Sequence, residues 1–548
     1  MPQPAKIDFK TIAPRNGSQA DAFEEFCCQV ARRYPGIPER SEFIRYRGAG
    51  GDGGVECLWR LPNGDEWGWQ AKYIFDLQRA KSALDESVAT AIKLHPKLTQ
   101  YVICLPFDLT GPTARHRKSQ RERFDDYRAE WEAHARAEGL SMSIPLLTPS
   151  TLLDNLLSFD PEGGRLRYWF DATILGDVWF KLHLEDVKAS AYPRYTPELR
   201  IETPLAEALE ALGLTDEWFG SLTGRLKGFR DVLQGWERSL ATKSDTGWGA
   251  IFPDAIRPQG EAAGGILSEI ADKFRRLAEA RETSIDIPAL AARTGEALQL
   301  FRSIRSEVAT AFEAEHGEGT ADSKQYRQFQ AEWQASFPAS NIDSADEVIK
   351  LLQAFTTWVN SPVALLPTGS EALILGQAGV GKTHGICDVA ERRLAQKFRT
   401  IILFGERFAG TVEPWEQIRQ QLGFDATLSR NALLAVLDAA GEASGKPLLL
   451  CVDGLNETRP RAYWRNYLPA FVAQARRYSW IRLCVSCRTT YELQVIPKTL
   501  HLPTVTHEGF EGIEFDACQE FFSHYGLEPP VTPVLQPEFP LWPAARPW

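Results

Sequence analysis

Three short stretches of the chain are almost entirely apolar: 372–375, 447–452 and 481–485. A short, nearly continuous apolar run is typical of a strand that is buried on both faces of a parallel sheet. The segment 384–394 follows the first run and has the pattern of a helix. We therefore predict that residues 346–510 form an α/β unit in which strands and helices alternate around a parallel sheet.

The N-terminal part of the chain has a different periodicity, in which apolar and polar residues alternate. This alternation places Val55, Cys57 and Trp59 on one face of a strand, and a second strand follows over 66–73. Asn63-Gly64-Asp65 between them predicts a β-hairpin with a three-residue turn. An amphipathic helix precedes the hairpin, with apolar positions at Phe23, Phe26, Cys27 and Val30.

Composition divides the 548-residue chain into four parts. Residues 1–175 mix helices and strands, residues 176–345 are mainly helical and rich in charge, and residues 346–510 form the α/β unit. The last part, 511–548, becomes dense in proline from Gly526 onward, and proline cannot propagate a helix. The predicted fold class is therefore multidomain α/β, with an N-terminal α/β domain, a helical linker and a parallel-sheet domain.

The net charge of the chain is −11, so no overall positive field draws it to nucleic acid or to an anionic membrane. No apolar run approaches the roughly 20 residues that a membrane-spanning helix needs, and no signal-peptide pattern opens the sequence. Nine cysteines are scattered along the chain, and the one CxxC spacing, Cys484–Cys487, has no second pair to complete a zinc site. We therefore expect a cytoplasmic protein with reduced thiols and no membrane partner.

The clearest motif is the segment GQAGVGKT at 376–383. Glycines in this pattern let backbone N–H groups wrap a triphosphate, while Lys382 reaches the outer phosphates and Thr383 binds Mg²⁺ through its hydroxyl. The glycines are Gly376, Gly379 and Gly381. With a predicted strand before it and a predicted helix after it, the motif indicates a phosphate-binding loop for ATP and Mg²⁺; the alternative is a glycine-rich turn that binds nothing.

Two further strand ends are expected beside this loop. The run 447–452 ends in Asp453, whose carboxylate would hold Mg²⁺ through water at the nucleotide edge of the sheet. Glu457, just beyond it, is the better candidate to orient or deprotonate the attacking water. The third strand ends at Arg488, which is placed to sense the γ-phosphate. The alternatives are a core strand capped by an acidic turn and an ordinary surface arginine.

Together, GQAGVGKT, LLLCVDGLNE and the strand ending in SCRTT resemble the STAND class of signal-transduction NTPases, and in particular its NACHT-like branch. The resemblance covers residues 350–510. It implies a P-loop switch in which nucleotide state and ligand recognition together control oligomerisation. This branch usually carries a second acid where the chain has Asn456, so the resemblance supports nucleotide binding more directly than hydrolysis.

The predicted hairpin carries a second group of polar residues. Gln70 and Lys72 project from one face of their strand, and a three-residue turn would place Glu56 opposite Lys72. An acid, an amide and an amine at one point suit metal-dependent phosphodiester hydrolysis, in which Glu56 binds Mg²⁺, the Gln70 carbonyl completes its shell and Lys72 activates water or steadies the phosphate. Glu24, beside the apolar stripe of the helix, is a further candidate ligand. The alternative is a structural hairpin with a salt-bridged lysine.

The segments FE at 23–24, GGDGGVE, and QAK at 70–72 resemble the Mrr-like branch of the PD-(D/E)xK nuclease superfamily. The resemblance implies a restriction-endonuclease-like domain that uses Mg²⁺ to cut double-stranded DNA. Glu56 stands where many relatives have Asp, and Asp52 is a fallback metal ligand. A basic cluster later in this region could follow a DNA backbone, although such clusters are more often solvated helix faces. It consists of Arg115, Arg117, Lys118, Arg121 and Arg123.

A nuclease ahead of a STAND NTPase resembles the bacterial antiviral STAND proteins. In that family a C-terminal helical-repeat sensor binds a phage protein, and tetramerisation then turns on DNA cleavage. Residues 194–199 and 514–522 resemble the family's linker and post-ATPase segments. The stretch 540–548 departs from the family pattern, which would fit a truncated gene, a frame-shifted gene or a sensor on a second chain. The resemblance implies an ATP-switched DNA endonuclease that assembles as a homo-tetramer on sensing a phage protein.

Two alternatives stay open. One is a regulatory NTPase scaffold whose nuclease-like domain is inactive, and Mg²⁺-dependent DNA cleavage by residues 1–175 would separate it from the nuclease. The other is a motor that translocates DNA. It would need helicase motifs after residue 453, and the sequence contains none that we can identify.

Overall fold

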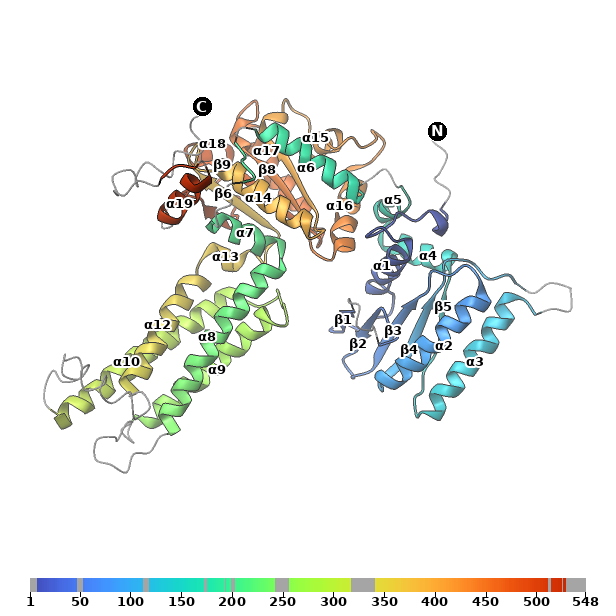
Figure 1. Cartoon of the computed structure of the whole chain (residues 1–548), viewed down its shortest axis with the longest axis horizontal. Coiled ribbons are helices and arrows are strands. Elements are labelled where there is room, and N and C mark those ends of the chain that lie inside the picture. The colour runs from blue at the N-terminus through green and yellow to red at the C-terminus, as the bar shows by residue number, and fades with distance from the viewer. Residues whose placement is uncertain are drawn as a thin grey trace.

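Figure 1 shows the computed structural model of the chain, in which two β-sheets belong to two different parts of the sequence. The structure describes residues 7–46, 53–111, 118–171, 175–192, 194–198, 203–241, 256–316, 341–510, 514–524 and 526–528. The mixed α/β architecture predicted from the sequence is confirmed.

The N-terminal sheet is built from the following elements: α1 Gln19–Arg32, β1 Glu42–Arg45, β2 Cys57–Arg60, β3 Glu66–Ala71, α2 Leu77–Leu94, β4 Leu98–Cys104, α3 Gln120–Ala137 and β5 Leu146–Leu147. Its strand order is β1-β2-β3-β4-β5. The first three strands are antiparallel, and β4 and β5 continue the sheet in parallel. Helix α1 packs on one face, whereas α2 and α3 pack on the other.

Helix α1 carries the apolar stripe that the sequence predicts. Ser18 caps its N-terminus by accepting a hydrogen bond from the Asp21 amide at 3.2 Å. Phe23 and Phe26 are fully buried in the cluster that also contains Trp69 of β3. Burial of each phenylalanine contributes about 1.5–3 kcal/mol relative to exposure. The stripe therefore holds α1 against the hairpin.

The β2–β3 hairpin has a three-residue turn, as predicted, but the turn comprises residues 62–64 rather than 63–65. The Leu61 amide donates a hydrogen bond to the Asp65 carbonyl oxygen at 2.8 Å. In the register that results, Glu56 lies across from Gln70 rather than from Lys72. The predicted pairing of Glu56 with Lys72 is therefore wrong, because a turn that lies one residue earlier shifts every cross-strand partner by two residues.

Val55 also departs from the predicted alternation. It packs with Leu58 on the α2 face of the sheet, whereas Cys57 faces α1. A Cβ added to Gly68 would lie 2.8 Å from a Val55 methyl carbon, so the glycine leaves the space that Val55 fills. Regular alternation therefore begins at Cys57, where β2 begins.

Helices α4 Pro149–Phe159 and α5 Gly164–Phe170 lead out of the N-terminal unit. Helix α5 packs on α16 Arg430–Ser444, which belongs to the second unit. A Cβ added to Gly164 would overlap the Cβ of Ala435, so this contact requires glycine. One buried apolar cluster runs through the contact and joins the two units.

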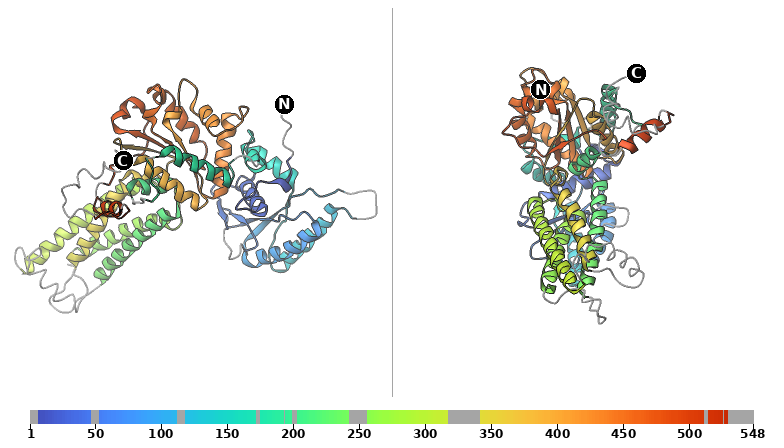
Figure 2. Two further views of the ribbon diagram at one scale, coloured as in Figure 1. Left: turned by 45° about the horizontal axis from the view of Figure 1, so that its top comes forward. Right: turned by 90° about the vertical axis from the view of Figure 1, so that its left-hand side faces the viewer.

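Four long helices form an extended arm (Figures 1 and 2). They are α8 Asp216–Ala241, α9 Arg257–Ala278, α10 Ile287–His316 and α12 Asn341–Val359. Helix α8 lies beside α9, and α10 lies beside α12. Trp236, Phe274 and Phe301 are buried between these helices, so the arm has an aromatic core of its own.

The second sheet has the strand order β10-β6-β9-β8-β7, and all of its strands are parallel. Its elements are α13 Pro362–Leu365, β6 Glu371–Gly376, α14 Lys382–Ala395, β7 Thr400–Phe404, α15 Pro414–Gln421, β8 Leu448–Asp453, α17 Tyr463–Ala475, β9 Ile481–Arg488, α18 Glu492–Val495 and β10 Thr504–Thr506. The predicted parallel sheet is confirmed. Strand β9 lies between β6 and β8, so the three polar strand ends meet at one edge.

The remaining helices are α6 Asp177–Ala191, α7 Pro204–Gly213 and α19 Glu514–His524. Helices α6 and α7 pack on α14, the helix that follows the glycine-rich loop. The described residues 194–198, which lie between these two helices in the chain, pass close to that loop, where Tyr195 and Thr196 contact His384 of α14. Across the part of the chain that the structure describes, we find no helix with the length and apolar character needed to cross a bilayer.

Candidate functional site

The glycine-rich loop connects the end of β6 to the start of α14. Gly379 and Gly381 have φ angles of +82° and +96°, which residues with a Cβ rarely adopt. A Cβ on Gly376 would lie 2.5 Å from the carbonyl oxygen of His507, so this position also needs glycine. The loop therefore takes a conformation that only this arrangement of glycines permits, with the first amides of α14 at its end.

Lys382 is the first residue of α14, and its side chain folds back over the loop. Its ammonium donates hydrogen bonds to the carbonyl oxygens of Gly376 and Gln377, both at 2.7 Å. Burial lowers the pKa of Lys382 from its ordinary value, with Asp453 nearby acting in the opposite direction. The ammonium group of Lys382 is thus held over the loop by hydrogen bonds to two neutral carbonyl groups.

Three polar groups meet at the carboxyl ends of β6, β8 and β9. The Thr383 hydroxyl donates to one carboxylate oxygen of Asp453 at 2.6 Å. The Ser486 hydroxyl donates to the other carboxylate oxygen and accepts a hydrogen bond from the Gly454 amide at 2.8 Å. Both oxygens of Asp453 are therefore oriented by the protein. Ser486 completes this group. It was not predicted as a site residue, although its place near the end of the strand that carries Arg488 is a signal that could have found it.

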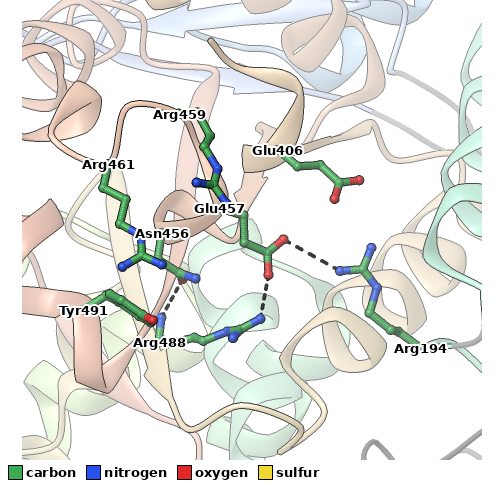
Figure 3. A pocket seen from close by; sticks show the side chains of 8 residues that line it. All are labelled: Arg194, Glu406, Asn456, Glu457, Arg459, Arg461, Arg488 and Tyr491. Atoms are coloured by element: carbon green, nitrogen blue, oxygen red, sulfur yellow. Dashed lines mark hydrogen bonds and ion pairs between the residues drawn. The ribbon is translucent and has the colours of Figure 1, made fainter.

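Glu457 lies just past Asp453, in the short 3₁₀ turn Leu455–Glu457. One of its carboxylate oxygens accepts a hydrogen bond from Arg488 at 2.9 Å, and the other lies 3.9 Å from Arg194 (Figure 3). The Arg488 amide also donates to the Asn456 side-chain oxygen at 2.9 Å. The predicted water-orienting acid and the predicted sensor arginine are thus in direct contact.

These residues line a cavity of about 260 Å³ above the glycine-rich loop. Its lining contains the loop glycines Gly379 and Gly381 together with Lys382, Thr383, Asp453, Glu457 and Arg488. Gly376 lies beneath it at the end of β6. Loop amides, an ammonium, a hydroxyl and a carboxylate are the groups that hold a triphosphate and Mg²⁺, so the cavity fits Mg²⁺ with a nucleotide.

Arg194 and His507 are also residues at this site that were not predicted as part of it. Arg194 lies between α6 and α7 in the chain, far from the loop in sequence, and the resemblance of residues 194–199 to a linker segment did not indicate that it lines the cavity. His507 follows β10, and its amide donates to the Leu375 carbonyl oxygen at 2.7 Å. Burial, reinforced by the charge of Lys382, lowers the pKa of His507 to about 4, so its ring stays neutral beside the loop.

The N-terminal unit brings Glu56 and Gln70 together. The Gln70 amide nitrogen donates to a Glu56 carboxylate oxygen at 2.7 Å. Gln70 is completely buried, and its amide oxygen has no hydrogen-bond partner among the described residues. An unsatisfied buried amide oxygen is costly, and a bound ligand or cation would satisfy it.

Lys72 is the first residue after β3. Its backbone amide donates a hydrogen bond to the Cys104 carbonyl oxygen at 3.1 Å. Its side chain is partly buried, and none of the described residues accepts a hydrogen bond or forms an ion pair with its ammonium. The alternative of a salt-bridged structural lysine therefore has no described acid to support it.

Arg45 of β1 reaches the same region. Its guanidinium donates to the Glu56 carbonyl oxygen at 2.9 Å and lies 3.9 Å from the Glu56 carboxylate. A second nitrogen of the group lies 3.4 Å from Glu25, which is buried on α1. Sequence reasoning missed both residues, because β1 and its register cannot be read from local pattern.

The other predicted metal ligands have different outcomes. Glu24 is partly buried on α1 and makes contacts of its own. Asp52 lies outside the described residues. In the ranges that the structure covers, no group of three or more His, Cys, Asp or Glu side chains has metal-binding geometry. The donors that fit a cation are thus the Glu56 carboxylate and the Gln70 amide oxygen, beside a guanidinium that carries the local positive charge.

The predicted basic cluster is only partly described, because Arg115 and Arg117 lie outside the described residues. Lys118 forms an ion pair with Asp126 at 2.6 Å, and Arg121 lies 3.8 Å from Asp125. The positive charges of Lys118 and Arg121 are therefore each paired with an aspartate of α3.

We compared the chain with known proteins: no protein-family model matches it, and no curated protein sequence does.

Proposed function

We propose that the chain binds ATP with Mg²⁺ at the loop 376–383 and hydrolyses it. The observation that carries the proposal is the 2.6 Å contact between the Thr383 hydroxyl and the Asp453 carboxylate. The two groups come from different elements, and they are oxygen ligands of the kind that Mg²⁺ takes beside bound phosphates. The proposal agrees with the resemblance of this region to the NACHT-like branch of STAND NTPases.

The position of each residue suggests its role. Lys382 exchanges its two contacts with loop carbonyl groups for the outer phosphates, because hydrogen bonds between charged groups are stronger. Thr383 and Asp453 hold Mg²⁺, which neutralises part of the phosphate charge when it is bound. Glu457 orients the attacking water and accepts its proton, while Arg488 turns from Glu457 towards the terminal phosphate.

Calorimetry of ATP binding to the full chain tests this proposal. Binding should be measurable with Mg²⁺ and clearly weaker with EDTA, because the metal offsets repulsion between the phosphates and Asp453. Asp453→Asn removes that charge and should reduce the difference between the two conditions. The same heat of binding with and without Mg²⁺ in the parent chain would contradict the proposed site.

The contact between Gln70 and Glu56 favours a second function, metal-dependent cleavage of double-stranded DNA. Helix α1 packs on the hairpin, so Phe23, Glu56 and Gln70, one residue from each of the three segments that resemble Mrr-like nucleases, lie in one structural unit. Glu56 and Gln70 supply two oxygen donors, and Lys72 lies beside them without a described acidic partner. We propose that these three residues form the nuclease site, with Lys72 activating water or stabilising the phosphate.

The resemblance to antiviral STAND proteins connects the two activities. In that reading the chain is a cytoplasmic, ATP-switched endonuclease that becomes active as a homo-tetramer when a sensor region binds a phage protein. The continuous buried core between α5 and α16 supports such coupling, because a close-packed interior transmits displacement of one unit to the other.

A regulatory NTPase scaffold with an inactive nuclease-like domain is the alternative. The observation that favours it is the Arg45 guanidinium against Glu56, since an arginine there competes with a cation for the same carboxylate. Plasmid cleavage by the full chain with ATP and Mg²⁺ would exclude the scaffold, because a scaffold leaves the plasmid intact under every nucleotide condition.

A further inference from the structure

A second cavity opens directly beside the nucleotide cavity. It has a volume of about 540 Å³ and shares four lining residues with the first cavity: Arg194, Asn456, Glu457 and Arg488. Figure 3 shows that two more arginines point into it from the loop after Glu457, and that Tyr491 closes one side. The two cavities therefore meet at Glu457, the residue that the proposed reaction places next to the terminal phosphate.

The second cavity is positively charged. Four arginines and two glutamates line it, and Arg194 and Arg488 are both within ion-pair distance of Glu457. Arg459 and Arg461 are exposed, and no described carboxylate lies within ion-pair distance of either. The Arg461 guanidinium instead lies over the Tyr491 ring, 4.5 Å from its centroid. Two guanidinium groups are thus available to an anion.

The backbone that carries these two arginines is firmly held. The Gly410 amide donates to the Arg459 carbonyl oxygen at 3.1 Å. The preceding residue, Thr458, is completely buried, and its hydroxyl donates to the Gly405 carbonyl oxygen at 2.7 Å and accepts from the Trp464 indole at 2.7 Å. An anion that binds here meets donors whose backbone is already ordered, which lowers the entropic cost of binding.

We propose that this second cavity is a subsite for inorganic phosphate on its way out of the nucleotide site. The inference rests on the proposed ATP hydrolysis. In that reaction the water oxygen bonds to the terminal phosphorus, the bond from that phosphorus to the oxygen of ADP breaks, and the water proton passes to Glu457. The phosphate released on the Glu457 side faces the second cavity, where Arg459 and Arg461 receive it.

The chemistry and the size of the cavity both suit this ligand. Guanidinium groups bind phosphate through paired, charge-assisted hydrogen bonds, and a doubly charged phosphate matches two arginines without an acidic partner. The volume exceeds that of a bare phosphate ion, so the anion keeps part of its water shell. The exposed positions of Arg459 and Arg461 leave the cavity open to solvent, as an exit route requires.

Equilibrium dialysis of radiolabelled orthophosphate against the full chain without nucleotide tests the subsite directly. The double variant Arg459→Gln/Arg461→Gln should bind phosphate at least about ten-fold more weakly, because each lost charge-assisted contact costs roughly that factor. Arg459→Lys/Arg461→Lys retains the charge but loses the paired contacts, so it should bind with intermediate affinity. The matched control is Arg465→Gln, an exposed arginine on α17 outside the cavity, which should bind like the parent chain.

A second comparison separates this subsite from the nucleotide loop. Lys382→Ala weakens any phosphate held by the loop but should leave binding at the second cavity unchanged. Phosphate affinity that falls with Lys382→Ala and not with the double arginine variant would overturn the subsite, as would a parent chain that binds no phosphate. Because the dialysis contains no nucleotide, this result stands apart from whether ATP binds. Circular dichroism of each variant shows that a loss of binding is not a loss of fold.

Discussion

Arg33, the residue that follows α1, and Glu442 on α16 form a bidentate ion pair, with both nitrogen–oxygen distances at 2.9 Å. The Glu442 side chain is only 1% exposed, and it also lies 3.2 Å from Arg32 and from Arg165. Arg165 in turn donates to Asp438. This buried cluster joins the N-terminal unit to the helix that leads into β8, the strand that ends in the proposed magnesium carboxylate. It is a direct physical connection between the two units that carry the proposed sites.

Glu442→Gln should lower the free energy of unfolding by about 3–5 kcal/mol, because it leaves buried guanidinium groups without their charged partner. Urea denaturation followed by circular dichroism measures the change. The exposed pair Arg60–Glu42 provides the matched control, since its side chains are 48% and 64% exposed. Glu42→Gln should therefore cost less than about 1 kcal/mol. Equal effects of the two variants would show that the cluster does not hold the units together.

The contribution of Glu442 to the free energy of unfolding should also depend on pH. Burial acts to raise the pKa of Glu442, but the arginines around it outweigh burial and hold the pKa below its ordinary value. A carboxyl with a lowered pKa stabilises the fold above its unfolded pKa of about 4.3, and this contribution is lost as the pH falls through the folded pKa. The difference in stability between the parent chain and Glu442→Gln should therefore shrink in acid below that pH. A difference that stays constant into acid would contradict this origin.

Lys382→Ala should weaken ATP binding roughly 10- to 150-fold, which corresponds to the loss of a charge-assisted contact of about 1.5–3 kcal/mol. The fold should be little affected, since the ammonium bonds only to two loop carbonyl groups, which lie beside a solvent-accessible cavity. Calorimetry with Mg²⁺-ATP gives the affinity. Lys350→Ala, an exposed lysine on α12, should bind ATP like the parent chain. Unchanged affinity in Lys382→Ala would move the nucleotide away from this loop.

Glu457→Gln should retain ATP and slow its turnover, because a neutral amide cannot accept the proton of the attacking water. The amide still reaches Arg488, so the local structure should persist. Phosphate release under single-turnover conditions measures the effect, with ATP affinity measured beside it. Hydrolysis at the parental rate would shift attention to Asn456, which accepts a hydrogen bond from the Arg488 amide.

The nucleotide site could largely be predicted from the sequence, because its parts are either contiguous or lie at the ends of neighbouring parallel strands. The loop 376–383 is local, and burial of β8 on both faces makes its run of apolar residues easy to recognise. Asp453 then meets Thr383 because parallel strands end at the same edge. Arg194 could not be predicted in this way, since it reaches the cavity from a segment whose path depends on how α6 and α7 pack.

The N-terminal site was harder to predict because it depends on register. Alternation correctly places Gln70 on the second strand of the hairpin, although Lys72 lies just past the end of that strand at Ala71. The partner of Glu56 depends on the exact position of the turn, which local composition does not fix to a single residue. Arg45 comes from β1, whose pairing with β2 is a tertiary property. The sequence could thus indicate candidate residues for this site, but it could not predict which of them lie close together.

Lys72→Ala is the cleanest test of the proposed nuclease site. Its ammonium has no partner among the described residues, so truncation should change the free energy of unfolding by less than about 0.5 kcal/mol. Glu56→Ala is less clean, because it leaves the buried Gln70 amide without its acceptor and should cost about 1–3 kcal/mol. Gel electrophoresis of plasmid DNA with Mg²⁺ and ATP should show cleavage by the parent chain and none by Lys72→Ala, although both bind ATP equally.

The matched control for this test is Lys93→Ala, an exposed lysine on α2 of the same unit, which should cut like the parent chain. It removes the same charge from the same domain, so it accounts for any general loss of attraction to DNA. If Lys72→Ala cuts at the parental rate while Glu56→Ala does not, the carboxylate acts without this lysine. If both variants cut like the parent, the reaction takes place elsewhere in the chain, and the hairpin is a structural element held by the Glu56–Gln70 contact.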